Sequence, residues 1–109
     1  MDKDITYVRD MLENIHLLES FLQNVTKDVF LGNLEKQFAS ARALEIIGEA
    51  SGKLSEEFKN NYPEVDWRGI KAMRNLLIHE YAYVDAEEVW KAYESDIPPL
   101  KEKLQRIPR

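Results

Sequence analysis

A chain of 109 residues that is 44% hydrophobic can bury a small core, and we take residues 1–109 as one domain. The net charge of −5 excludes a broad, non-specific nucleic-acid binder but leaves room for a small, locally basic site. The absence of cysteine excludes disulfides and thiolate metal sites, and apolar runs of a few residues exclude a membrane span. Because residues 1–4 lack the basic-then-apolar order of a signal peptide, we expect a cytoplasmic protein.

The first quarter of the chain carries the pattern of one long helix. Its apolar residues recur every three or four positions, the spacing of a single buried stripe: Ile5, Val8, Leu12, Ile15, Leu18, Leu22 and Val25. Residues 32–33, Gly-Asn, then interrupt the pattern. Asn33 is suited to cap the next helix, so we expect that helix to begin at residue 34.

A second helical pattern follows Asn33. Its apolar positions again step by three or four: Leu34, Phe38, Ala41, Leu44, Ile47, Ala50, Leu54 and Phe58. Ser55, followed by two glutamates, predicts a fresh helix start. Residues 60–63, Asn-Asn-Tyr-Pro, should end this region, because proline disfavours helix in the residue before it.

Two more helices are predicted in the second half. Asp66 is suited to cap a third helix, and Asp85, with a glutamate three residues later, a fourth. The third helix should turn three apolar residues toward the core: Ile70, Met73 and Leu77. Residues 98–99, Pro-Pro, predict a kink or break in the fourth. Without strand alternation, the sequence predicts an all-α, up-and-down bundle of four or five helices.

The second helix has a face of small residues. At about 100° per residue, Ala41, Gly48 and Gly52 fall close together on it. Glycine inside a helix costs about 1 kcal/mol relative to alanine, so the close approach of another helix should compensate. That helix could belong to the same chain, which is the favoured interpretation, or to a second subunit.

Residues 74–81, Arg-Asn-Leu-Leu-Ile-His-Glu-Tyr, place a cation, an amide, an imidazole and a phenol near the end of the third helix. Arginine can neutralise a phosphate, and histidine can move protons near neutral pH. On an ideal helix Asn75 and His79 are one turn apart, so the amide could orient the imidazole. Arg74 and His79 could cleave RNA without a metal if both reach one phosphodiester. By spacing alone, a partly buried histidine, a surface ion pair of Arg74 and a packed Tyr81 are the commoner interpretations.

A short basic stripe extends from the same motif. Arg68, Lys71 and Arg74 recur every three residues on one helix. On charge alone such a stripe is more often a solvated face than a binding site. In an acidic protein, however, this stripe is where a small phosphate-binding site could lie.

A second charged group lies on the second helix. Arg42, Glu45 and Glu49 share one sector, and an ion-pair cluster is the favoured interpretation. In the functional alternative, one of these carboxylates orients Arg74 or His79. Because no Glu-x-x-His pair accompanies the glutamates, we predict no metal and no cofactor.

Four segments together resemble the HepT toxins, which are compact members of the HEPN superfamily. They are residues 43–50 (Ala-Leu-Glu-Ile-Ile-Gly-Glu-Ala), 62–67 (Tyr-Pro-Glu-Val-Asp-Trp), 73–81 (Met followed by the motif above) and 89–90 (Val-Trp). The likeness runs in order over nearly the whole chain. The Arg-x4-His-x-Tyr motif is present without departure.

The resemblance implies an all-helical, HEPN-like homodimer in which the Arg-x4-His motifs of two subunits meet in one cleft. It implies the toxin of a type VII toxin–antitoxin system, a metal-independent ribonuclease with RNA as substrate. Arg74 and His79 would be catalytic and Asn75 supporting. A nucleotidyltransferase antitoxin similar to MntA would transfer AMP from ATP to Tyr81, within a complex that could be a larger hetero-oligomer. The alternative is a non-catalytic accessory subunit that helps a nucleotidyltransferase hold a nucleotide or substrate.

Overall fold

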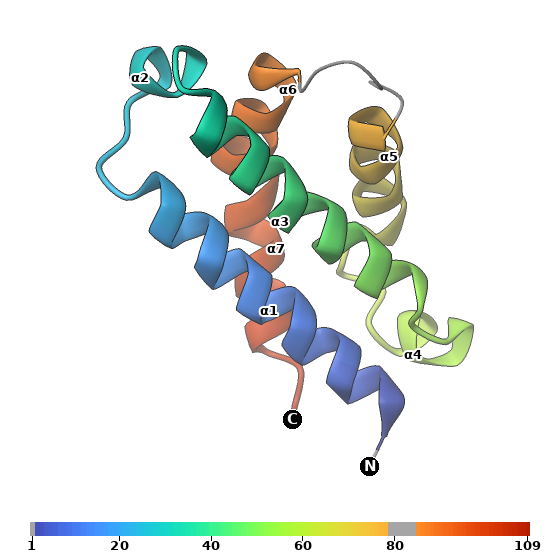
Figure 1. The fold of residues 1–109 in the computed structure, drawn as a ribbon. Coiled ribbons are helices and arrows are strands. Elements are labelled where there is room, and N and C mark those ends of the chain that lie inside the picture. The colour runs from blue at the N-terminus through green and yellow to red at the C-terminus, as the bar shows by residue number, and fades with distance from the viewer. Residues whose placement is uncertain (1, 79–84) are drawn as a thin grey trace.

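The computed structural model describes residues 2–78 and 85–109, with the side chains of residues 76–78 excepted, and every regular element in this part of the chain is a helix (Figure 1). The elements are α1 (Lys3–Leu22), α2 (Lys27–Leu31), α3 (Leu34–Gly52), α4 (Glu56–Asn61), α5 (Trp67–Ile78), α6 (Ala86–Lys91), the π-helical turn η1 (Ala92–Asp96) and α7 (Ile97–Gln105). The predicted all-α class is confirmed. Within the described ranges, no helix is long and apolar enough to cross a membrane.

The core forms along the seam between α1 and α3, which run side by side, and is closed by α7 (Figure 1). Val8, Ile15 and Leu18 of α1 are fully buried, as are Leu44 and Ile47 of α3. Each such side chain stabilises the fold by about 1.5–3 kcal/mol relative to its exposed state. The apolar stripes predicted for these two helices therefore face each other along most of their length. The prediction is wrong for Leu34 and Phe38 at the start of α3, whose side chains are exposed. Beyond them, α5 packs on the other side of α3 and depends on that helix for its position.

All four predicted cap residues accept a hydrogen bond from the first turn of their helix. The bonds run from Lys36 N to Asn33 Oδ1 (3.0 Å), Phe58 N to Ser55 Oγ (3.1 Å), Gly69 N to Asp66 Oδ1 (2.9 Å) and Glu88 N to Asp85 Oδ1 (3.2 Å). Each bond satisfies an N–H group that has no partner within its helix. The starts of α3, α4, α5 and α6 are therefore fixed by single local side chains.

The first helix is shorter than predicted. It ends at Leu22, and Val25 lies outside it, because Asn24 adopts the left-handed conformation with φ of 61°. The chain then turns, and Thr26 Oγ1 accepts a hydrogen bond from Val29 N at 3.3 Å. This cap begins α2, a five-residue helix that the sequence pattern does not predict.

The short helix α2 is held by contacts with α6 and α3. Its buried Phe30 packs against Trp90 of α6, with ring centroids 5.2 Å apart. Gln37 Nε2 donates to the carbonyl oxygens of Phe30 at 2.9 Å and Leu31 at 3.1 Å. These contacts supply partners for the end of a helix too short to be stable alone.

Near Pro98-Pro99, where the sequence predicts a kink or break, the helix is not interrupted but widens one turn earlier. The π-helical turn η1 ends at Asp96, and α7 begins at Ile97 with both prolines in its first turn. Prolines lack the N–H that would bond to a carbonyl one turn earlier, so a wider turn there absorbs the mismatch. At the start of a helix the missing donors cost little.

A tether joins the beginning of α1 to the beginning of α4. Ser55 N donates to Asp4 Oδ1 at 2.8 Å, and Ser55 Oγ donates to Asp4 Oδ2 at 2.9 Å. The same hydroxyl caps α4 by accepting from Phe58 N. Asp4 therefore holds α4 near the C-terminal end of α3, where it forms a wall of the groove described next.

Candidate functional site

Arg74 of α5 lies directly against Gly48 of α3. A Cβ atom added to Gly48 would stand 2.6 Å from Arg74 Cβ, 2.9 Å from Cγ and 3.0 Å from Cδ. A Cβ on Gly52 would stand 3.7 Å from a guanidinium nitrogen of Arg74. The small face of α3 thus receives the arginine of the motif. The intrachain explanation accounts for Gly48, whereas a Cβ at Gly52 would make only an ordinary van der Waals contact. Arg74 itself is half-buried, with its stem fixed between two helices.

The guanidinium opens into a groove of about 690 Å³ between the C-terminal end of α3, α4 and the first half of α5. Four cationic side chains line the groove: Lys59, Arg68, Lys71 and Arg74. One carboxylate, Glu56, also lines it, and its Oε1 lies 3.9 Å from Lys59 Nζ. The predicted basic stripe of α5 therefore faces a groove, and α4 extends it. Clustered cations in a groove attract a phosphate chain despite an acidic net charge.

Arg42, Glu45 and Glu49 form the predicted ion-pair cluster. Arg42 Nη1 lies 3.1 Å from Glu45 Oε2 and 3.6 Å from Glu49 Oε1. The Arg42 side chain is 61% exposed, so these pairs contribute little to stability. Both carboxylates are engaged with Arg42. Within the described residues, no carboxylate lies at ion-pair distance from Arg74, and the surface ion pair considered for it stays a prediction.

The remaining predicted site residues are only partly covered by the structure. Asn75 is half-buried on α5, next to Arg74. His79 and Tyr81 lie outside the described residues, so their proposed roles stay predictions. The chain's other histidine, His16, is exposed on α1 with Nδ1 3.5 Å from Glu19 Oε1.

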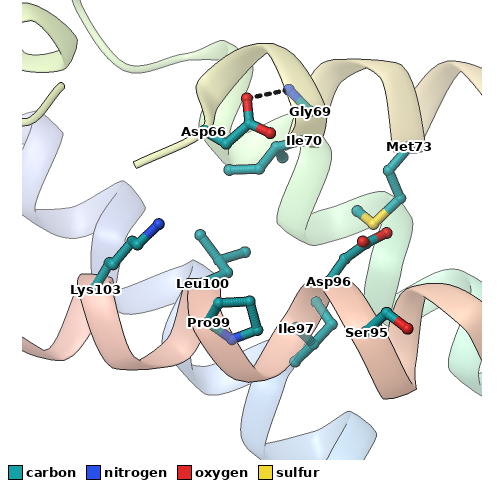
Figure 2. A pocket seen from close by; sticks show the side chains of 10 residues that line it. All are labelled: Asp66, Gly69, Ile70, Met73, Ser95, Asp96, Ile97, Pro99, Leu100 and Lys103. Carbon is teal, nitrogen blue, oxygen red and sulfur yellow. Dashed lines mark hydrogen bonds between the residues drawn. The ribbon is translucent and has the colours of Figure 1, made fainter. Parts of the chain in front are cut away.

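A smaller cavity of about 230 Å³ lies on the opposite face of α5, against α7 (Figure 2). Its wall is largely apolar and includes Ile70, Ile97 and Leu100. The carboxylate of Asp66 is already bonded to Gly69 N, as the dashed line in Figure 2 shows. This cavity lies between α5 and α7 and offers no cluster of cations, so we place the candidate site in the larger groove.

Lys59 is the groove residue that sequence inspection misses. It sits three residues after Glu56 on a six-residue helix, a pattern that indicates only a surface ion pair. Nothing in the linear pattern relates α4 to the stripe of α5. The two helices are brought together by the cap at Ser55 and the turn at residues 62–66.

The comparisons with known proteins identify the family of this chain. A family model described as "Ribonuclease HepT-like" matches residues 11–107. The chain belongs to this family. The resemblance to HepT and the HEPN superfamily predicted from the motifs is thereby confirmed.

Individual relatives cover nearly the whole chain. The protein named "Probable ribonuclease HepT" of Thermococcus cleftensis is 44% identical over 101 residues, covering 93% of this chain and 92% of that protein. "Putative RNase MJ1380" of Methanocaldococcus jannaschii is 33% identical over 101 residues, covering 93% of each chain. "Putative RNase MJ0127" of the same organism is 36% identical over 106 residues, covering 96% of this chain and 88% of that protein. No solved structure matches the chain.

Proposed function

We propose that this HepT-like protein is a metal-independent ribonuclease in which Arg74 and His79 act on one phosphodiester. The proposal rests on one observation above all: the motif arginine is fixed against Gly48 and directs its guanidinium into a cationic groove. Family membership and the names of the relatives support the same activity. A guanidinium already ordered by packing loses little further freedom when it binds a phosphate.

The chemistry needs one base, one acid and one cation. Neutral His79 removes the proton of the ribose 2′-hydroxyl, and the resulting oxygen attacks the adjacent phosphorus. Arg74 stabilises the charge that develops on the non-bridging oxygens. The bond from phosphorus to the 5′-oxygen breaks, and a protonated imidazole supplies that oxygen with its proton. The products are a 2′,3′-cyclic phosphate and a 5′-hydroxyl, with Asn75 positioning the base.

The second imidazole must come from a second subunit. The chain has two histidines, and His16 lies exposed on α1, which does not line the groove. We therefore place the partner subunit's His79 opposite the first, so that one acts as base and the other as acid. A two-fold dimer also doubles the basic stripe at the cleft, which suits an acidic chain.

We further propose that the activity is that of a toxin controlled by modification. A nucleotidyltransferase antitoxin would transfer AMP from ATP to the Tyr81 hydroxyl, with release of pyrophosphate. The added phosphodiester is negative and bulky and lies two residues from His79. It can pair with Arg74 and fill the cleft, as phosphate-bearing modifications do elsewhere. Incubation with the antitoxin and ATP should add whole AMP groups to the wild-type mass and none to Tyr81→Phe.

The test of the activity compares three proteins on total RNA in excess chelator. Wild type should cut, whereas Arg74→Met and His79→Ala should be reduced by at least about 100-fold. Arg74→Met keeps an unbranched stem over Gly48, so its loss of activity reports the guanidinium and not the packing. Equal RNA cleavage by all three proteins would contradict the assignment of this activity to Arg74 and His79. RNA binding without cutting by wild type would instead favour the non-catalytic accessory subunit.

A further inference from the structure

The groove continues well beyond Arg74, along residues that the Arg-x4-His-x-Tyr motif does not include. Lys71, Arg68 and Lys59 lead away from the arginine toward α4. We propose that this stretch is a binding track for the unpaired RNA strand that flanks the scissile phosphate, with one base stacked on Trp67. The inference rests on the proposed ribonuclease activity and assigns a site that this activity alone does not require.

The indole of Trp67 is held in place by its own hydrogen bonds. Its Nε1 donates to the carbonyl oxygens of Lys59 at 3.3 Å and Tyr62 at 3.1 Å, which joins the start of α5 to the end of α4. Trp67 is half-buried and lines the groove. With the polar edge engaged by the backbone, the aromatic surface is what a ligand can contact.

Cations flank this indole on two helices. Arg68 and Lys71 are exposed on α5, whereas Lys59 projects from α4, so charge lies on two walls of the same groove. Glu56 offsets part of this charge, but its side chain is 87% exposed and its contact with Lys59 is long, at 3.9 Å. A cationic groove interleaved with an aromatic side chain is typical of sites for single-stranded nucleic acid.

The length of the track suits a short strand. From Arg68 to Arg74 the axis of α5 rises about 9 Å, at about 1.5 Å per residue. Stacked nucleotides advance about 3.4 Å each along a strand, so the stripe spans roughly two to three nucleotides. A duplex would present its bases edge-on and leave no base free to stack on Trp67, which is why we assign an unpaired strand.

Binding is tested with a short 2′-O-methyl oligonucleotide of mixed sequence, which lacks the attacking hydroxyl and cannot be cut. We expect Lys59→Gln and Arg68→Gln each to weaken binding and to reduce the slope of log K against log salt by about 0.7. Arg9→Gln, which removes an exposed cation from α1, should bind as wild type. Unchanged affinity and salt slope in both groove variants would overturn the proposal.

Stacking of a base on Trp67 can be measured separately by tryptophan fluorescence. The oligonucleotide should quench the fluorescence of the wild type, and Trp67→Phe should abolish the quenching, because Trp90 is buried against Phe30. Trp67→Ala should bind at least about fivefold more weakly, and Trp67→Phe should retain part of the affinity. Circular dichroism and thermal melting identify any variant that has not folded. No quenching by the oligonucleotide, with the folded wild type bound, would remove Trp67 from the site.

Cleavage of the matching ribo-oligonucleotide separates the two proposals. If wild type and the groove variants cut it equally, the nuclease stands and the track is wrong. If none of them cuts while binding still depends on Lys59 and Arg68, the track stands and the nuclease is wrong. If both variants keep RNA binding and lose binding to the nucleotidyltransferase, the groove belongs to a protein partner and the proposal fails.

Discussion

The side chain of Arg74 crosses the backbone of Gly48, and no atom larger than hydrogen fits between them. The contact joins α3 to α5, and it fixes the cation that the proposed chemistry needs. Close packing therefore accounts for glycine at position 48, and in the proposed mechanism the same contact orients the catalytic cation. The contact also separates the two roles of Arg74, because its stem packs on α3 and its charged end serves the groove.

The two roles of Arg74 can be measured separately. The unfolding free energy of Arg74→Met should lie within a few tenths of a kcal/mol of the wild-type value, because the unbranched side chain still covers Gly48. Arg74→Ala should lose about 1 kcal/mol of unfolding free energy, since buried methylene groups are removed. Both should lose RNA cleavage, and Arg74→Lys should recover only part of it, because lysine lacks the planar fork of donors. Chemical denaturation and cleavage rates on the same samples check this.

The same variants can show that Arg74 has no part in cleavage. Full cleavage by Arg74→Met, with lowered stability in Arg74→Ala, would show that the arginine serves packing alone.

The glycines of α3 offer a matched pair. Gly48→Ala places a Cβ 2.6 Å from Arg74 Cβ, so α5 must move away, and we expect a net loss of roughly 1 kcal/mol or more despite the better helix propensity of alanine. Gly52→Ala meets only an ordinary contact at 3.7 Å and should raise stability by about 0.5 kcal/mol. Urea denaturation of both variants tests the packing. Equal effects would contradict the close approach at Gly48.

The clash at Gly48 should not be relieved by shortening Arg74. The nearest atom is the Cβ of residue 74, which alanine retains. Gly48→Ala should therefore remain destabilising in the Arg74→Ala background. A neutral effect there would mean that only the outer part of the arginine stem meets α3.

The tether between Asp4 and Ser55 should appear as a coupling energy. Asp4→Ala and Ser55→Ala each remove the hydroxyl-to-carboxylate hydrogen bond of 2.9 Å, and Ser55→Ala also removes the cap of α4. A double-mutant cycle in unfolding free energy should give a coupling of about 0.5–1 kcal/mol. Strict additivity would show that the hydroxyl-to-carboxylate hydrogen bond of the tether contributes nothing to stability.

One exposed pair gives a prediction about pH. The hydrogen bond and charge of Glu87, at 2.9 Å, hold the pKa of Lys27 above its ordinary value of 10.5. A raised pKa in the folded state means that the pair contributes fully below pH 10.5 and that its contribution is lost as the pH rises through the folded pKa. Glu87→Gln should lower the Lys27 pKa measured by NMR titration. Glu94→Gln, which removes a weaker influence on Lys27, should lower it less.

Local sequence signals predicted the helix starts, because a capping side chain acts within its own first turn. Asn33, Ser55, Asp66 and Asp85 all cap as expected. The helix α2 escaped prediction because five residues carry almost no periodicity, and its stability comes from Trp90, which is distant in sequence, and from Gln37 on the next helix.

For the candidate site, the sequence predicted which residues share a face of one helix, but not which helices come together. Spacing placed Arg68, Lys71 and Arg74 on one face, and the structure turns that face into a groove. Spacing could not show that Gly48 receives Arg74 or that Lys59 joins the stripe. Both facts depend on which helices pack together, and helical periodicity carries no information about the neighbour.

The central claim is that two subunits contribute to one active site, and mixed dimers test it most directly. Wild type is unfolded and refolded with an equal amount of His79→Ala, and cleavage is compared with wild type refolded alone at the same wild-type concentration. If each site needs the imidazoles of both subunits, mixing should halve the activity, because about half of the wild-type chains then pair with an inactive partner. Activity unchanged by mixing would show that one subunit is sufficient and would contradict the shared site.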